Sequence, residues 1–265
     1  MARITCNFYS YSVGYPIDIQ IILPSLSPCD GDVMPELTHK ITEKYPVIYF
    51  LHGHGNDYLC WSRFTSIERY VEERRIAAVF CSVGNKAYMN AEYGENWFDL
   101  VEKELPEFVE TNFPISDKKE DRYVAGLSMG GYGALKCGLL APDTFGAVAS
   151  LSGGVDAIDC ANDADSEGKN GTLWFDIFGP HDQIKGSDND LFAVAERLAA
   201  SGKDKPKVYM WCGTEDFLYG QNVRMRDHLN KLGYDLTYEE SPGDHQWKYW
   251  DEKIQTVLAW LPIKK

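Results

Sequence analysis

The sequence of 265 residues lacks any apolar run approaching the roughly 18 residues that a membrane-spanning helix requires. Its first residues, Met1 to Cys6, lack the apolar stretch of a secretory signal peptide. Positive charge is also scarce, because 26 Lys and Arg stand against 40 Asp and Glu, for a formal net charge of -14. A surface this acidic repels phosphate backbones and anionic lipids. These absences predict a soluble, cytoplasmic chain without a membrane span, whose partners do not include nucleic acid.

Paired cysteines are absent as well. The seven cysteines are odd in number and scattered, and no two have the C-x-x-C spacing of a redox or zinc site. Several lie in apolar stretches, where a free thiol packs as a small hydrophobic group. This distribution favours a reducing compartment, which agrees with a cytoplasmic location.

The pattern that is present is that of an α/β protein. Hydrophobic residues make up 44% and charged residues 25%, as in a globular protein long enough for one sizeable core. Short β-branched and aromatic runs alternate with helical patterns, which predicts a mainly parallel sheet with helices on both faces. Strands are expected at 4–10, 17–23, 46–51, 77–82, 122–127, 146–151, 207–212 and 235–239, the first two as an antiparallel hairpin. Helices are expected at 61–75, 97–112, 130–140, 190–201, 220–232 and 246–260.

One segment interrupts this alternation. Residues 153–190 are rich in Gly, Asp and Asn and show no clear periodicity. A stretch of that length without a pattern of its own is typical of functional lids. We therefore interpret it as a lid-like insertion over the site, within a single domain that spans residues 1–265.

A nucleophile motif stands at the junction of a predicted strand and a predicted helix. Residues 126–130 read Gly-Leu-Ser-Met-Gly, which matches the G-x-S-x-G pattern of a nucleophile elbow. The turn from strand to helix is so tight that its neighbouring side chains must be small, hence the glycines. The elbow lifts the hydroxyl of Ser128 above the sheet, beside a helix N-terminus that favours developing negative charge. The motif predicts the α/β-hydrolase fold, with Ser128 as the nucleophile.

A serine hydroxyl needs a base to take its proton, and in this fold the base follows the nucleophile in the chain. Three histidines follow Ser128. Of these, His181 lies in the insertion and His228 lies within a predicted helix. His245 lies in a loop between the last strand and the last helix, where the fold requires its base. We therefore predict His245 as the base.

The acid that orients the base should follow the preceding strand. Residues 208–212 form that strand, and both Glu215 and Asp216 come shortly after it. Either carboxylate could hold the imidazole and stabilise the imidazolium that forms. We favour Asp216 and keep Glu215 as the alternative.

Two backbone N–H groups are expected to stabilise the tetrahedral oxyanion, and losing one such donor can cost about 100- to 1000-fold in rate. One belongs to Met129, the residue after the nucleophile. The other lies in the loop 52–55, which reads His-Gly-His-Gly, and we favour the N–H of His54. No carboxylate or Cys near His52 and His54 completes a ligand set, so neither a metal nor a cofactor is expected.

With these residues placed, the chain resembles the esterase D-type hydrolases, and within them the bacterial tributyrin esterases, which act on short acyl esters. The segments that carry the resemblance are 51–56, 125–133, 211–213 with 216–219, and 243–247 with 249–250. They cover nearly the whole chain in the expected order. The resemblance places the family's triad on Ser128, Asp216 and His245, and its oxyanion donors on His54 and Met129.

The resemblance implies a serine carboxylesterase that hydrolyses short-chain acyl esters through an acyl-enzyme, with a small-molecule or oligosaccharide ester as substrate and a homo-oligomeric state. Related enzymes include S-formylglutathione hydrolases, feruloyl and acetylxylan esterases, and mycolyltransferases. The alternatives are therefore a feruloyl or acetylxylan esterase acting on plant cell-wall oligosaccharides, or a thioesterase like the S-formylglutathione hydrolases. The latter usually carry a different oxyanion loop. Acyl transfer would use the same residues, whereas a non-catalytic binding protein usually lacks one of the triad.

Aromatic side chains are the candidates for the substrate pocket. Trp61, Trp97, Trp174 and Trp247, with Phe175, could line an acyl or ring pocket. The alternative is that most of them belong to the core, because an aromatic side chain buries a large area wherever it lies.

Overall fold

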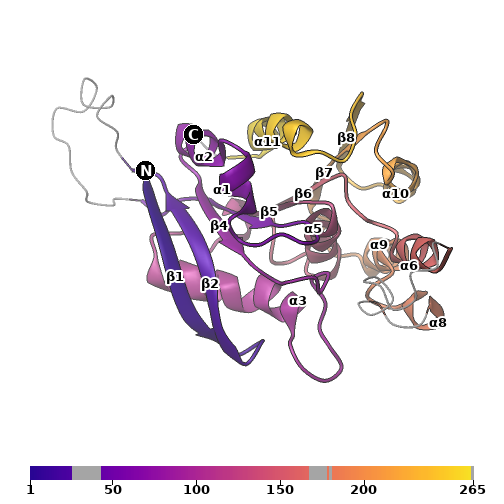
Figure 1. The fold of residues 1–265 in the computed structure, drawn as a ribbon, viewed down its shortest axis with the longest axis horizontal. Helices are drawn as coiled ribbons and strands as arrows, with labels where there is room; N and C mark the ends of the chain where they lie inside the picture. Colours follow the sequence, from indigo (N-terminus) through magenta and orange to yellow (C-terminus); the bar gives the residue numbers. More distant parts are fainter. Residues whose placement is uncertain (26–42, 167–177, 179–180, 264–265) are drawn as a thin grey trace.

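The computed structural model describes residues 1–25, 43–166, 178 and 181–263, and Figure 1 shows them built around one sheet. Within these ranges the strands are Ala2–Ser10 (β1), Tyr15–Leu23 (β2), Val47–Leu51 (β3), Ala77–Cys81 (β4), Arg122–Leu127 (β5), Ala147–Leu151 (β6), Lys207–Gly213 (β7) and Leu236–Ser241 (β8). Their order in the sheet is β1-β2-β4-β3-β5-β6-β7-β8. β2 pairs antiparallel with β1 and with β4, and every other pair is parallel. The predicted mainly parallel sheet and its N-terminal hairpin are confirmed.

Helices cover both faces of this sheet. In chain order they are Cys60–Phe64 (α1), Ile67–Glu73 (α2), Trp97–Asp99 (α3), the π-helical turn Leu100–Glu104 (η2), Leu105–Asn112 (α4), the 3₁₀ turn Lys119–Asp121 (η3), Met129–Leu140 (α5), Ala157–Ser166 (α6), His181–Ile184 (α8), Leu191–Ser201 (α9), Tyr219–Lys231 (α10) and Trp247–Trp260 (α11). Figure 1 shows α1, α2 and α11 on one side of the sheet, and α3, α5 and α9 on the other.

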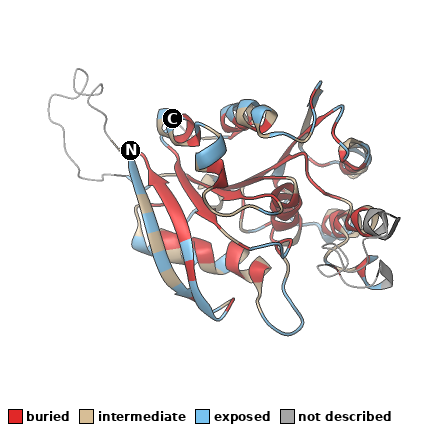
Figure 2. Cartoon of the chain, viewed as in Figure 1, coloured by how far each residue is buried: buried red, intermediate tan, exposed pale blue. Residues whose placement is uncertain are grey.

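The central strands are apolar on both faces, and this creates two cores. Along β3, Tyr49 and Leu51 join the cluster under α4, α5, α9 and α10, whereas Ile48 and Phe50 join the cluster under α1, α2 and α11. Alternate residues of a strand point to opposite faces, so a continuous apolar run fills both cores at once. Figure 2 shows these central strands buried along their length.

The predicted helix 61–75 is two helices, α1 and α2. The periodicity of the apolar residues continues across the break, but Thr65 has extended backbone (φ -136°, ψ 171°). Its hydroxyl donates to the carbonyl of Trp61 at 2.6 Å and accepts from the N–H of Ile67 at 3.1 Å. A threonine side chain that binds the backbone on both sides in this way competes with the helical hydrogen bonds.

The predicted helix 97–112 is continuous in space but changes its winding, from α3 through the π-helical η2 to α4. Pro106 stands in the first turn of α4. Because proline has no N–H, it cannot donate to the carbonyl four residues earlier, and the turn before it is free to widen.

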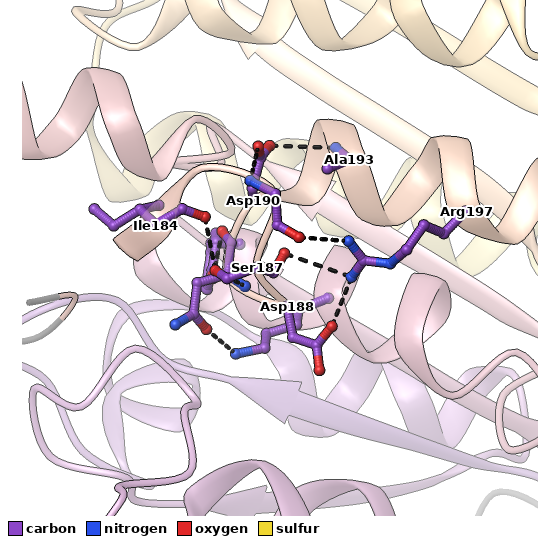
Figure 3. A network of polar contacts seen from close by, with 10 residues as sticks. Ile184, Ser187, Asp188, Asp190, Ala193 and Arg197 are labelled. Atoms are coloured by element: carbon purple, nitrogen blue, oxygen red, sulfur yellow. Dashed lines mark hydrogen bonds and ion pairs between the residues drawn. The ribbon is translucent and has the colours of Figure 1, made fainter. Parts of the chain in front are cut away.

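The segment 153–190 contains helices that its composition did not predict. α6 and α8 lie within it, and Trp174 and Phe175 lie outside the described residues. Its end is ordered by the N-cap of α9, where the carboxylate of Asp190 accepts from the N–H of Ala193 at 3.2 Å. Arg197 of α9 reaches back to the carboxylate of Asp188 at 2.6 Å (Figure 3). That this segment is a lid, and that the chain is a single domain, stay predictions.

The same turn is tied to α5 by a buried lysine. Lys136 is 3% exposed, and its ammonium donates to Oδ1 of Asn189 at 2.7 Å. One helical turn earlier, the hydroxyl of Tyr132 donates to the carbonyl of Asn189 at 3.1 Å. Burial lowers the pKa of Lys136 to about 8, because a charged ammonium is costly away from water. The helix that begins at the nucleophile motif therefore also holds the end of the insertion.

Across the described part of the chain, no helix combines the length and the apolar character needed to cross a membrane.

Candidate active site

Ser128 lies in a strained turn between β5 and α5. Its backbone has φ 54° and ψ -121°, a conformation that residues other than glycine rarely adopt. The turn also brings backbones into contact around it. A methyl group on Gly126 would lie 2.1 Å from the carbonyl oxygen of Gly130, and one on Gly130 would lie 2.3 Å from that of Leu51. Both positions therefore require glycine, as the motif predicted.

The three predicted catalytic side chains meet at the carboxyl edge of the sheet. Nε2 of His245 lies 3.0 Å from Oγ of Ser128, and Nδ1 of His245 lies 2.8 Å from Oδ2 of Asp216. The Asp216 side chain is 0% exposed and that of His245 is 21% exposed. The second oxygen of Asp216 accepts from the N–H of Leu218 at 2.9 Å, which fixes the orientation of the carboxylate. This geometry suits a hydroxyl, a base and an acid acting in series.

Parallel register explains why residues so far apart in the chain meet here. β5 pairs with β6 through Leu127 and Leu151, and β6 pairs with β7 through Leu151 and Trp211. The carboxyl ends of these strands therefore lie at one edge, and the loops that follow them share that edge.

Glu215, the alternative acid, binds groups other than the imidazole. One of its oxygens accepts from the N–H of Gly243, and the other accepts from the hydroxyl of Thr214 at 2.9 Å. The hydrogen bond from Gly243 lowers the pKa of Glu215, since it stabilises the charged form. Glu215 thus connects the loop after β7 to the loop that carries His245.

Two aromatic rings flank His245. The rings of Trp250 and His245 make a T-shaped contact with their centroids 4.8 Å apart, and the ring of Phe217 is tilted by 51° to the imidazole with its centroid 4.7 Å away. Trp250 is buried and its indole N–H donates to Oγ of Ser152 at 3.1 Å. Phe217 is 76% exposed, so one of its faces is open to solvent beside the base. Both lie in segments that carry the family resemblance, but the sequence assigned neither a role, because nothing in their spacing distinguishes them from core or surface aromatics.

The expected oxyanion donors lie next to the nucleophile. Met129 is the first residue of α5, so its N–H has no partner within the helix. The loop 52–55 passes beside Ser128, since a methyl group on Gly53 would lie 3.3 Å from Cβ of Ser128. His54 follows directly, with its carbonyl held by the side chain of Asn56 at 3.1 Å. One expected donor therefore lies at the N-terminus of α5, and the other belongs to the loop that passes beside Ser128.

The predicted pocket tryptophans occupy different environments. Trp61 is 1% exposed and Trp97 is 7% exposed, each within one of the two cores, so little of either ring could touch a substrate. Trp247 is half-buried, stacks on Phe64 with the ring centroids 5.0 Å apart, and lies two residues after His245 in the chain. Trp174 lies outside the described residues. Their part in substrate binding stays a prediction.

His52 and His54 do not converge on a common ligand position. His52 is 1% exposed and bonds to backbone groups through both ring nitrogens. Burial lowers the pKa of both histidines, which favours their neutral forms. Among the residues that the structure describes, no group of three or more His, Cys, Asp or Glu side chains is arranged to hold a metal ion.

Comparison with known proteins gives consistent matches over almost the whole chain. Residues 10–261 match the family model described as "Putative esterase". An acetyl esterase of Caldicellulosiruptor saccharolyticus is 31% identical over 265 residues, covering 98% of each chain. The substrate-bound structure of FphF, a fluorophosphonate-binding serine hydrolase of Staphylococcus aureus, is 31% identical, with a TM-score of 0.87 over 99% of both chains. The apoenzyme of the S-formylglutathione hydrolase FrmB, from the same organism, is 31% identical, with a TM-score of 0.84 over 98% of both.

Proposed function

The chain belongs to the esterase family and is a carboxylic ester hydrolase, and from that premise we propose that it cleaves short-chain acyl esters through an acyl-enzyme formed on Ser128. The observation that carries the proposal is the position of His245, which contacts both Ser128 and Asp216. A short acyl group is supported by the acetyl esterase, which matches along nearly its full length.

The first half-reaction transfers the acyl group to the enzyme. Oγ of Ser128 attacks the ester carbonyl while Nε2 of His245 takes its proton. Asp216 holds Nδ1 of the imidazole and stabilises the positive charge that it gains. The N–H groups of Met129 and His54 receive the oxyanion. When the tetrahedral intermediate collapses, Nε2 returns the proton to the departing alcohol and the acyl group remains on Ser128.

The second half-reaction repeats these steps with water. Nε2 of His245 takes a proton from water as the water attacks the acyl-enzyme, and the same two N–H groups receive the oxyanion. Collapse of this intermediate breaks the bond to Oγ of Ser128, which recovers its proton from His245. The carboxylic acid leaves and the free enzyme is restored.

The test is kcat/KM on a series of p-nitrophenyl esters from acetate to octanoate, together with methyl ferulate, with Ser128→Ala as the blank. We expect the maximum at acetate to butyrate and the loss of turnover in the variant. A fluorophosphonate probe should label the wild type once and leave Ser128→Ala unlabelled, as read by intact mass. A maximum at methyl ferulate would replace this proposal with a feruloyl esterase. Turnover near wild type in Ser128→Ala would refute the nucleophile.

A thioester is the second candidate substrate. The observation that favours it is the likeness to FrmB, whose described activity is S-formylglutathione hydrolysis. The same chemistry would serve, because a thiolate leaves more readily than an alkoxide. A kcat/KM for S-formylglutathione that exceeds the value for p-nitrophenyl acetate would favour this candidate, and the reverse ranking would favour the short-chain ester.

A further inference from the structure

We infer that His52 is a positioning residue, whose neutral imidazole fixes the Gly53–His54 peptide so that the N–H of His54 is directed toward the oxyanion. This inference rests on the proposed function, since it concerns the same reaction. It assigns a role to a buried histidine whose hydrogen bonds go to Gly53 and Val83, and not to Ser128 or His245.

The hydrogen bonds of His52 determine which ring nitrogen carries the proton. Nε2 of His52 lies 3.0 Å from the backbone nitrogen of Val83, and a backbone N–H can only donate. Nε2 is therefore the acceptor and carries no proton. In a neutral imidazole the proton is then on Nδ1, which lies 2.8 Å from the carbonyl oxygen of Gly53 and donates to it. The two bonds together require one tautomer of the uncharged ring.

The donation from His52 sets the direction of the neighbouring N–H. The carbonyl of Gly53 and the N–H of His54 belong to one trans peptide plane, in which the two groups point in opposite directions. The carbonyl oxygen of Gly53 also accepts from the N–H of Asn56 at 3.2 Å. With two donors holding the oxygen, the plane cannot rotate freely, and the His54 N–H points away from the imidazole. Gly53 lies beside Ser128, so the direction of the His54 N–H decides whether an oxyanion formed at Ser128 finds a hydrogen-bond donor there.

The loop after β4 supports the same arrangement from a second side. Oδ1 of Asn85 accepts from the N–H of Gly55 at 2.8 Å, and the hydroxyl of Tyr88 donates to the carbonyl of His52 at 2.8 Å. Together with Val83, these residues bind the oxyanion loop on both sides of the Gly53–His54 peptide, at His52 and at Gly55. The loop is thus held at three points by residues 83–88.

Tyr88 connects this loop to the nucleophile helix. It is fully buried and its backbone lies in the left-handed region, with φ 54°. Its ring packs so closely on α5 that a methyl group on Gly133 would lie 2.4 Å from it. A buried, non-glycine residue keeps such a conformation only when its surroundings enforce it. Since α5 also carries Met129, Tyr88 places the two oxyanion donors relative to one another.

Three substitutions at His52 separate the donor from the acceptor. His52→Asn keeps an N–H donor at the position of Nδ1, His52→Gln keeps an acceptor at the distance of Nε2, and His52→Leu keeps neither. We expect His52→Leu and His52→Gln to lose about 10- to 100-fold in kcat with little change in KM, because a misdirected donor weakens only the transition state. His52→Asn should stay within about 10-fold of the wild type, because it retains the bond to Gly53.

The readouts are kcat and KM on p-nitrophenyl acetate and the inhibition constant of a trifluoromethyl ketone, whose adduct with Ser128 carries an oxyanion. Inhibition should weaken in step with kcat. His228→Leu is the matched control, because Nε2 of His228, on α10, lies 3.1 Å from a backbone carbonyl oxygen, that of Phe192 on α9, and has no place in the site described above. Thermal unfolding of each variant reports whether it folds. If His52→Leu does not fold, Tyr88→Phe removes only the bond to the His52 carbonyl and should lower kcat by a smaller factor.

The inference is overturned if folded His52→Leu, or Tyr88→Phe in its place, has the kcat of the wild type. It is also overturned if His52→Asn loses as much kcat as His52→Leu, because then the donor to Gly53 is not what matters. Failure of the wild type to hydrolyse any ester in the series would instead refute the proposed function. The two failures are therefore distinct.

Discussion

Replacing Asp216 by Asn tests how the acid works, because the structure determines which way the new side chain must lie. Oδ1 of Asp216 accepts from the N–H of Leu218 at 2.9 Å, and Oδ2 lies 2.8 Å from Nδ1 of His245. A carboxamide has one acceptor oxygen and one NH₂ donor. Turning the NH₂ toward Leu218 would leave two buried donors facing each other, at a cost of about 1–3 kcal/mol. The oxygen therefore stays with Leu218, and the NH₂ faces His245.

This orientation reverses the tautomer of the base. An NH₂ group cannot accept a hydrogen bond, so Nδ1 of His245 must become the acceptor and its proton must move to Nε2. In that tautomer Nε2 cannot take the proton of Ser128. The side chain of Asp216 is 0% exposed, so water has no access from which it could accept the proton of Nδ1 and restore the original tautomer. We expect a loss of about 10⁴-fold in kcat with the fold intact, the size associated with a wrong tautomer in a serine hydrolase.

The assay is kcat on p-nitrophenyl acetate for Asp216→Asn, with Glu215→Gln as the matched control one residue away. The carboxamide oxygen of the control can still accept from Gly243, so Glu215→Gln should lose less than about 10-fold. A greater loss in Glu215→Gln than in Asp216→Asn would mean that the acid was wrongly assigned. Activity of Asp216→Asn within about 10-fold of the wild type would refute the tautomer argument.

Three further predictions concern stability. Gly126→Ala places a methyl group 2.1 Å from a backbone oxygen in α5, so it should lower the free energy of unfolding by at least about 3 kcal/mol and Tm by more than about 6 °C. The control Gly220→Ala, in an open helical position, should not lower Tm. Arg122→Met leaves the carboxylate of Glu110 buried without its bidentate partner, so the free energy of unfolding measured in urea should fall by about 3–5 kcal/mol. The double variant Arg122→Met with Glu110→Leu should recover most of that loss. Additive losses from the two substitutions would contradict the prediction. The pKa of Lys136 is about 8 in the folded protein against 10.5 in the unfolded chain, so the unfolded chain binds more protons between pH 8 and pH 10.5. The free energy of unfolding of the wild type should therefore rise by about 2–3 kcal/mol over this pH range, relative to that of Lys136→Met. Parallel pH profiles of the two proteins would refute this prediction.

The secondary structure was largely predictable because its signals are local. The apolar run at 46–51 ends at a glycine-rich loop, and β3 occupies Val47–Leu51. The errors arose where a side chain acts on its own backbone. Thr65 ends α1 through hydrogen bonds of its hydroxyl, although the apolar periodicity continues past it. The composition of 153–190 likewise concealed α6, because the Asp and Asn that favour loops also occur on exposed helix faces.

The nucleophile elbow is a local feature of the chain, so its residues and their spacing could be read directly. Ser128 requires a strand, a tight turn and a helix in succession, and the steric demand of that turn permits only glycine at positions 126 and 130. The order of nucleophile, acid and base then restricted the search for His245 to a single loop. These features depend on covalent neighbours and on the fold's chain order, both of which a sequence contains.

Other features depend on where a side chain points, and only the tertiary structure decided them. Glu215 and Asp216 are adjacent, chemically alike and equally well placed in the chain, yet one binds Gly243 and the other binds His245. His52, which the sequence placed in the expected oxyanion loop without a role of its own, bonds to Gly53 and to the loop after β4. Apart from Gly53, these partners are brought in by parallel register between strands, through contacts far apart in the sequence. No local pattern encodes those directions, because they are set by the backbone geometry of loops that meet only in the folded protein.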